Sequence, residues 1–132
     1  MRISESSEDY LERILMLSEK LPVVRSVDIA NDMGYKKSSV SVAMKNLRLS
    51  GKITVTPAGY IYLTPEGKQI ASMIYERHKC FSKWLKELGI DETTAANDAC
   101  HMEHALSEQS FEAIKEYIRR HPVNASETAA EN

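Results

Sequence analysis

Residues 26–63 read SVDIANDMGYKKSSVSVAMKNLRLSGKITVTPAGYIYL, and this stretch decides the fold of the chain. Its apolar spacing predicts a short helix over 27–33, with Gly34 after it as a left-handed C-cap, and a second helix over 38–49. Two runs of β-branched and aromatic residues then flank a Pro-Ala-Gly turn within 53–63, which predicts a β-hairpin. Helix, turn, helix and hairpin in this order are typical of a winged helix-turn-helix domain.

Further helices are predicted on both sides of this stretch. Apolar residues recur at spacings of three and four over 8–20, which predicts an amphipathic helix before the helix-turn-helix. Thr-Pro-Glu at 64–66 is a typical helix start, and the apolar pattern that follows it fits one helix of about 25 residues. Two shorter helices are predicted over 91–106 and 107–120, each preceded or started by polar capping residues.

Length and composition limit the class of protein. The chain has 132 residues, 42% hydrophobic and 27% charged, which suffices for one compact unit or two small subdomains and excludes a large multidomain enzyme. No apolar run approaches the roughly 18 residues of a membrane-spanning helix, so we expect a cytoplasmic protein with no membrane partner. Two cysteines cannot build a disulfide framework.

The predicted fold is therefore mainly α with a small β-hairpin. We expect a winged helix-turn-helix DNA-binding domain at 1–63, followed by an all-helical metal-binding and dimerisation domain at 64–121. Residues 122–132 are rich in Ser, Thr, Ala and Glu, and this composition predicts a disordered tail.

Charge is distributed unevenly along the chain, although its formal net charge is only −2. Residues 1–63 carry 9 Lys and Arg against 7 Asp and Glu, whereas residues 64–132 carry 8 against 12. Within the first half, residues 34–52 contain five cations and no acidic residue: Lys36, Lys37, Lys45, Arg48 and Lys52. A basic block of this kind indicates a surface that faces a polyanion, and the alternative is an ordinary solvated helix face.

The turn and the hairpin, together with the basic block, favour double-stranded DNA as the partner. The second helix of the motif would then enter the major groove, and its exposed residues are the candidate DNA contacts: Lys36, Lys37, Ser38, Ser39, Ser41, Lys45 and Arg48. Residues near the start of that helix are best placed for base edges or phosphates. Lys45 and Arg48 are better placed for the backbone, where they would set affinity and its salt dependence.

A second motif lies in the acidic half, in the sequence NDACHMEHALS at 97–107. On a helix, Cys100, Glu103 and His104 fall at positions i, i+3 and i+4, so a thiolate, a carboxylate and an imidazole would surround a common point. This composition is typical of a metal site, whereas each residue alone is more often packed or solvated. Asp9 and Glu12 on the first helix and His78 on the long helix are further candidates; their alternatives are carboxylates near a helix N-terminus and an exposed histidine.

In these motifs the chain resembles a known family, the metal-dependent repressors related to the diphtheria toxin repressor and the manganese transport regulator. The resemblance covers residues 5 to 120 and is specific in four places: EDYLE at 8–12, the helix-turn-helix around 28–30 and 38–40, the pair Arg77-His78, and the motif at 97–107. It implies a winged-helix domain, a helical dimerisation domain and a metal site at their junction. The ligands that it implies are Asp9, Glu12, His78, Cys100, Glu103 and His104.

The site departs from both branches of that family. Manganese regulators have a glutamate at the Cys100 position, and the iron repressors have a cysteine there. Asp9 and Glu12, by contrast, resemble the manganese branch, because the iron branch has a methionine at the Asp9 position. Carboxylates and imidazoles suit Mn²⁺ and Fe²⁺, while a thiolate favours Fe²⁺, Co²⁺ or Zn²⁺, so we expect Fe²⁺ first and Mn²⁺ next. Six ligands with three carboxylates suggest a binuclear site.

The sequence thus predicts a metal-dependent transcriptional repressor of metal homeostasis genes, and not an enzyme. It would act as a homodimer on a palindromic operator, with metal binding activating DNA binding. One alternative is a winged-helix regulator that responds to an organic ligand. A less favoured alternative is a metallohydrolase that uses the same ligands around an open coordination position.

Overall fold

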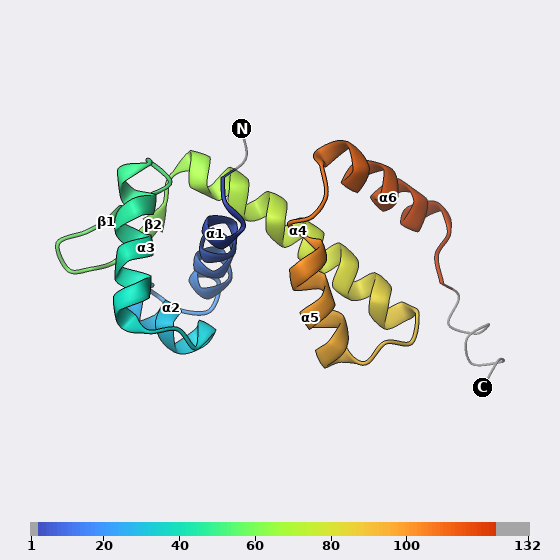
Figure 1. Cartoon of the computed structure of the whole chain (residues 1–132), viewed down its shortest axis with the longest axis horizontal. Coiled ribbons are helices and arrows are strands. Elements are labelled where there is room, and N and C mark those ends of the chain that lie inside the picture. Colours follow the sequence, from blue (N-terminus) through green and yellow to red (C-terminus); the bar gives the residue numbers. More distant parts are fainter. Residues whose placement is uncertain (1–2, 124–132) are drawn as a thin grey trace. The chain divides into compact units, whose positions relative to one another are not determined.

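The computed structural model describes residues 3–123 and divides into two compact units, with the boundary along the chain between Ile74 and Tyr75. Figure 1 shows the elements in chain order. They are α1 (Glu5–Ser18), α2 (Ser26–Met33), α3 (Lys37–Leu49), β1 (Ile53–Val55), β2 (Ile61–Leu63), α4 (Pro65–Glu87), α5 (Glu92–Met102) and α6 (Glu108–Arg120). The predicted mainly α fold with one small hairpin is confirmed. The predicted tail, residues 122–132, falls almost wholly outside the described residues.

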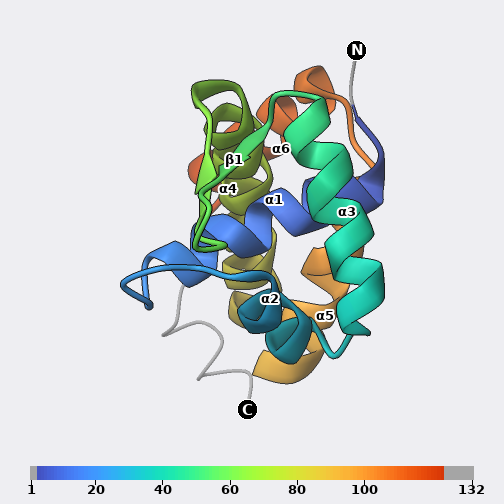
Figure 2. The same cartoon turned by 90° about the vertical axis from the view of Figure 1, so that its left-hand side faces the viewer.

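The helix-turn-helix has α2 and α3 joined by the turn at Gly34 (Figure 2). Gly34 has a φ of 71°, and its N–H donates to the carbonyl of Ala30 at 2.9 Å, so it is the left-handed C-cap that the sequence predicts. The start of α2 differs from the prediction, because Ser26 is already helical. Arg25 is the N-cap instead, and the Asp28 carboxylate accepts its backbone N–H at 2.9 Å.

The first helix starts earlier than its apolar pattern indicates. The Ser4 hydroxyl accepts the backbone N–H of Ser7 at 3.2 Å, so α1 begins at Glu5 rather than at residue 8 and ends at Ser18. A polar first turn carries no apolar signal, and the periodicity therefore identified the helix but not its first residue.

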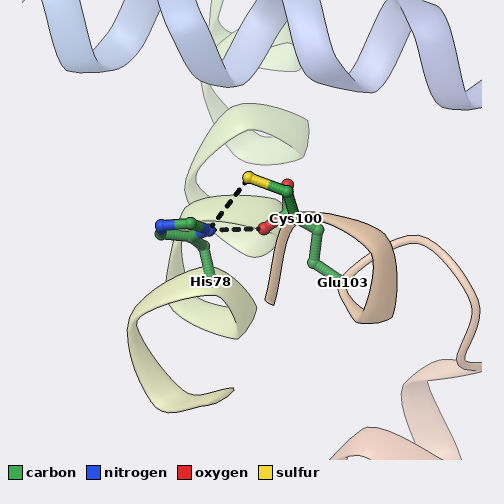
Figure 3. Close-up of side chains that lie close together, drawn as sticks. All are labelled: His78, Cys100 and Glu103. Atoms are coloured by element: carbon green, nitrogen blue, oxygen red, sulfur yellow. Dashed lines mark hydrogen bonds and ion pairs between the residues drawn. The ribbon is translucent and has the colours of Figure 1, made fainter. Parts of the chain in front are cut away.

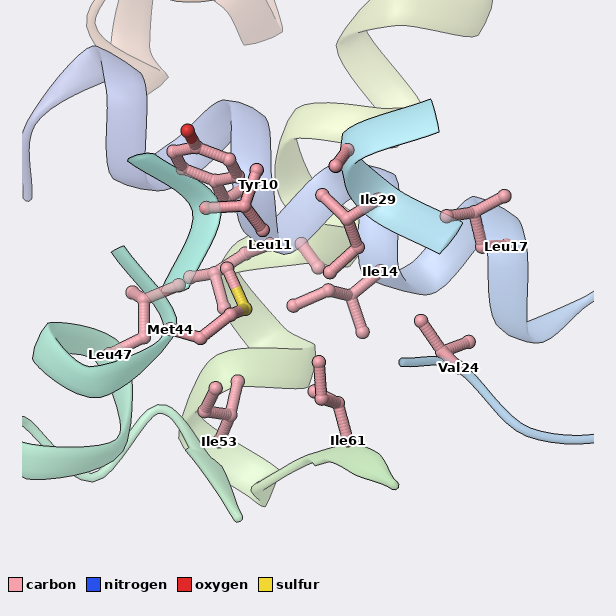
Figure 4. Close-up of a cluster of buried hydrophobic side chains, with 13 residues drawn as sticks. Tyr10, Leu11, Ile14, Leu17, Val24, Ile29, Met44, Leu47, Ile53 and Ile61 are labelled. Carbon is pink, nitrogen blue, oxygen red and sulfur yellow. The ribbon is translucent and has the colours of Figure 1, made fainter. Parts of the chain in front are cut away.

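The hairpin is short and one side of it is buried. Ile53 pairs with Leu63 and Val55 with Ile61, and the turn closes where the Thr56 N–H donates to the carbonyl of Tyr60 at 2.9 Å. Figure 4 shows Ile53 and Ile61 among the apolar side chains of the helices. This core is made by Tyr10, Leu11, Ile14, Leu17, Val24, Ile29, Ala30, Val40, Met44, Leu47, Ile53, Ile61 and Ala71.

The start of α4 packs tightly against the beginning of the hairpin. The Thr64 hydroxyl accepts the N–H of Gly67 at 3.1 Å and donates to the carbonyl of Gly51 at 2.7 Å. The Thr64 N–H donates to the carbonyl of Lys52 at 3.1 Å. A Cβ atom at Gly67 would overlap that same carbonyl, so the approach of helix to strand requires glycine here.

The second unit has its own small core. Phe81 on α4 and Phe111 on α6 are buried and meet edge to face, with ring centroids 5.6 Å apart at 78°. Ala99 on α5 is buried with them, and its small side chain allows close packing. No helix within residues 3–123 is long and apolar enough to cross a membrane.

The fifth helix ends earlier than predicted, at Met102 instead of about Leu106. Glu103 is its C-cap, and the Ala105 N–H donates to the Met102 carbonyl at 3.1 Å in a tighter turn. The Ser107 hydroxyl then accepts the N–H of Ser110 at 3.1 Å and caps α6. The apolar pattern continues through this turn because Leu106 still packs against the core of the second unit, so the pattern alone overestimates the helix.

Candidate metal centre

Three of the predicted ligands come together inside the second unit (Figure 3). His78 lies on α4, Cys100 on α5, and Glu103 directly after α5. The Nδ1 atom of His78 lies 2.9 Å from Oε2 of Glu103 and 3.7 Å from Sγ of Cys100. One ligand atom from each residue lies within 4.8 Å of the others, which makes this group a candidate metal site.

His104 reaches the other oxygen of the same carboxylate. Its Nε2 atom lies 3.3 Å from Oε1 of Glu103, and its side chain is only 2% exposed. The predicted helical stripe of Cys100, Glu103 and His104 is wrong in detail, since α5 ends before Glu103. Glu103 nevertheless has a histidine at each of its two oxygens, His78 from α4 at Oε2 and His104 from the turn at Oε1.

The geometry of the cluster fits a transition metal ion. Two ligand atoms that bind one ion at about 2.0–2.3 Å lie roughly 3–4 Å apart, depending on the coordination angle. The two separations at His78 Nδ1, 2.9 and 3.7 Å, are close to this range. Imidazole, carboxylate and thiol are all transition-metal donors, and a fully buried carboxylate such as Glu103 requires cationic or hydrogen-bonding partners.

Protonation decides whether these groups can bind an ion. The Nδ1 atom of His78 faces both Glu103 and Cys100, and when it carries a proton it donates that proton instead of a lone pair. An ion bound at this nitrogen would require the tautomer with its proton on Nε2, and a bond from Cys100 to that ion would require the thiolate. Metal binding by this cluster would therefore release protons and weaken on acidification.

Arg77 holds the backbone of the ligand-bearing turn, and the sequence interpretation gave it no role of its own. Its Nη1 atom donates to the carbonyls of Glu103 at 3.2 Å and Leu106 at 2.6 Å, and its guanidinium lies 5.1 Å from the centre of the Phe111 ring. The side chain is 1% exposed. A signal was present, because residue 77 falls on the apolar stripe of α4 between Ile74 and Phe81, where a charge must find buried acceptors.

The remaining predicted ligands lie on α1 of the first unit. Asp9 is half-buried and Glu12 is buried, at 4% exposure. They are three residues apart, so they lie on the same side of the helix. The N-cap at Ser4 places both in the interior of α1, away from the first turn where a carboxylate merely complements the helix dipole.

The predicted DNA contacts are all exposed on α3 or at its first residues: Lys36, Lys37, Ser38, Ser39, Ser41, Lys45 and Arg48. Val40, Met44 and Leu47 on the opposite side of α3 are buried. An open pocket of about 430 Å³ adjoins the beginning of α3, with Tyr35, Lys36 and Ser39 among its lining residues. This face offers cationic and hydroxyl groups without an acidic neighbour on α3.

A winged helix-turn-helix with an exposed cationic helix, followed by a helical unit with a metal-ligating cluster, defines a DNA-binding regulator that responds to a metal ion. Two family models match the chain in the same order. The model described as the iron dependent repressor N-terminal DNA binding domain matches residues 2–59. The model described as the iron dependent repressor metal binding and dimerisation domain matches residues 64–125. The chain belongs to the iron-dependent repressor family of metal-dependent transcriptional repressors.

Known relatives agree with this assignment. The chain is 37% identical over 120 residues to an uncharacterised helix-turn-helix transcriptional regulator of Methanocaldococcus jannaschii, covering 89% of this chain and 96% of the relative. It is 32% identical to the transcriptional regulator MntR of Escherichia coli, covering 89% of this chain and 76% of that protein. The manganese regulator SloR superposes with a TM-score of 0.76 at 26% identity, over 86% of this chain and 53% of SloR. The chain thus spans about half the length of that structure.

Proposed function

We propose that this repressor is activated by Fe²⁺, with Mn²⁺ as the second choice, through a site built from His78, Cys100, Glu103 and His104. Asp9 and Glu12 of α1 would complete the ligand set. The observation that carries the proposal is the position of His78 Nδ1, 2.9 Å from a Glu103 oxygen and 3.7 Å from the Cys100 sulfur. Six ligands, three of them carboxylates, exceed the need of one four-coordinate ion and support a binuclear site.

The choice of metal rests on Cys100. A thiolate is a softer ligand than a carboxylate, so it favours Fe²⁺, Co²⁺ and Zn²⁺ over Mn²⁺. Zn²⁺ is also favoured by the general affinity order, and selection in the cell then depends on coordination geometry and on which metals are available. The description of SloR names manganese and the description of the family names iron, so the donor set is a better guide to the metal than the names.

The ligands would couple metal binding to DNA binding because they come from both units. Asp9 and Glu12 belong to the helix before the helix-turn-helix, whereas the other four belong to the second unit. When bound, the metal supplies a positive charge that both ligand groups can share. We expect a homodimer whose two α3 helices match successive major grooves of a palindromic operator, about 34 Å apart. Any gain in DNA affinity from metal must equal the gain in metal affinity from DNA.

The test is anaerobic fluorescence anisotropy of the full chain with duplex DNA from its own upstream region, at fixed salt. Chelator is present first, and Mn²⁺, Fe²⁺, Co²⁺ or Zn²⁺ is then added in separate titrations. DNA affinity is expected to rise with metal and to return to its starting value with excess chelator. Equally tight binding in chelator would contradict the proposal and favour the regulator that responds to an organic ligand.

Two variants locate the site. Glu103→Gln is expected to abolish the metal response, since it removes the carboxylate that lies between His78 and His104. Cys100→Ser is expected to shift the metal ranking toward Mn²⁺ without abolishing the response. His101→Ala is the matched control, because His101 is exposed beside Cys100 and contributes nothing to the cluster. An unchanged metal ranking in Cys100→Ser would remove the thiolate from the ligand set.

A further inference from the structure

The outward side of α3 carries two apolar residues that the DNA-binding prediction did not use. Val42 is 60% exposed and Leu49 is 69% exposed. They are seven residues apart, which is close to two helical turns, so they lie on one line along the helix. Figures 1 and 2 show α3 on the surface of the first unit, and this line is opposite the side that packs into the core.

The surroundings of Val42 are polar and cationic. One helical turn before it lie Ser38 and Ser39, and one turn after it lie Lys45 and Asn46, all of them exposed. Residues 34–52 contain no carboxylate. The charge of this face suits an anionic partner, and Val42 would be buried by a partner that also presents an apolar group there.

Double-stranded DNA has both properties. Its phosphates supply the negative charge, and the C5-methyl group of thymine is the apolar group on the floor of the major groove. Side chains from the N-terminal part of a recognition helix contact base edges. Val42 lies in that part of α3, whereas Leu49 is its last residue.

We propose that Val42 is a specificity-determining residue that contacts the methyl group of a thymine in each half of the DNA site. Ser38 and Ser39 flank this contact and are suited to hydrogen bonds with base edges or phosphates. Lys45 contributes affinity for the backbone that does not depend on sequence. The proposal rests on the proposed function, because it requires that α3 enter the major groove.

The size of the effect follows from one methyl group. Removing a methyl or methylene group from water contributes about fourfold to an equilibrium constant. Loss of the thymine methyl at one contacted position is therefore expected to weaken binding by about fourfold. Loss of both methyl groups of Val42 should weaken binding to the preferred sequence by a similar or somewhat larger factor.

The experiment combines a protein change with a change in the DNA. A duplex is selected from a random library by the metal-loaded full chain, and each thymine in it is replaced singly by deoxyuridine, which removes only the methyl group. At one position in each half-site, the replacement is expected to weaken the unaltered protein about fourfold and to leave Val42→Ala unaffected. Leu49→Ala is the matched control for an exposed apolar residue, and it should keep the thymine dependence.

Several outcomes would overturn the inference. Equal loss in the unaltered protein and in Val42→Ala at every replaced position would show that another group reads the methyl. A selected duplex with no thymine dependence would show that no thymine methyl is read, while leaving DNA binding, and thus the proposed function, in place. A change of oligomeric state in Val42→Ala would assign the residue to a protein interface. Failure to select any duplex would instead contradict the proposed function itself.

Discussion

Replacing Gly67 with alanine is expected to destabilise the protein, although the same change in most helices has the opposite effect. In an ordinary helix, alanine is more stable than glycine by about 0.5–1 kcal/mol. At position 67, however, the new Cβ would overlap the carbonyl oxygen of Lys52. That carbonyl also accepts the Thr64 N–H at 3.1 Å, so it cannot retreat without lengthening a hydrogen bond next to β1.

The magnitude follows from two opposing contributions. Overpacking against backbone costs about 1–3 kcal/mol, and a weakened hydrogen bond adds roughly 0.5–1.5 kcal/mol. The gain in helix propensity offsets less than 1 kcal/mol of this sum. We expect Gly67→Ala to lower the free energy of unfolding by about 1–4 kcal/mol.

Urea denaturation followed by far-ultraviolet circular dichroism measures this change. Ser72→Ala is the control, because residue 72 is exposed on the same helix and the substitution should alter stability by no more than about 0.5 kcal/mol. A Gly67→Ala variant as stable as the unaltered chain, or more stable, would refute the steric argument.

Three other substitutions test separate parts of the structure. Arg77→Lys should reduce metal affinity and lower the free energy of unfolding by about 2–4 kcal/mol, because an ammonium lacks the planar fork that reaches the carbonyls of Glu103 and Leu106. Isothermal titration with metal measures the first effect and thermal unfolding the second. Wild-type values in both would contradict the role of Arg77 in holding this turn. Thr64→Val should lower the free energy of unfolding, measured by urea denaturation, by about 1 kcal/mol, since it removes the N-cap of α4. An unchanged free energy would argue against a capping role for Thr64. Hydrogen bonds from the backbone and side chain of Thr94 lower the pKa of Asp91. The Asp91 charge therefore stabilises the folded state at pH values above the ordinary pKa of an aspartate, and this contribution is lost as the pH falls through the lowered pKa. The difference in melting temperature between Asp91→Ala and the unaltered chain should accordingly shrink below about pH 4, and a constant difference would exclude the charge as its cause.

Much of the fold could be predicted from periodicity and caps. Gly34 and the apolar spacing of α2 and α3 identified the helix-turn-helix, because their signals are local: one left-handed residue and one buried stripe. The apolar pattern alone placed the start of α1 at residue 8 instead of Glu5, and the end of α5 near Leu106 instead of Met102. A polar first turn gives no apolar signal, and Leu106 stays in the core although the helix has already ended.

The candidate site was predictable in composition but not in geometry. Spacing grouped Cys100 with Glu103, and the position of His78 on the long helix made it a further candidate, which the structure places 2.9 Å from Glu103. The role of Arg77 depends on carbonyls that lie 26 and 29 positions further along the chain, and no local pattern contains that information. An arginine on an apolar stripe was the available signal.

The acid-free face of α3 also bears on how quickly the protein can find its site. A concentrated positive surface attracts DNA over about one Debye length, roughly 8–10 Å at physiological salt, before any base is contacted. Such encounters are independent of sequence and allow the protein to slide or hop along the duplex. If α3 contacts DNA as predicted, the exposed Lys36, Lys37, Lys45 and Arg48 would set the speed of this search, which should slow steeply as salt rises.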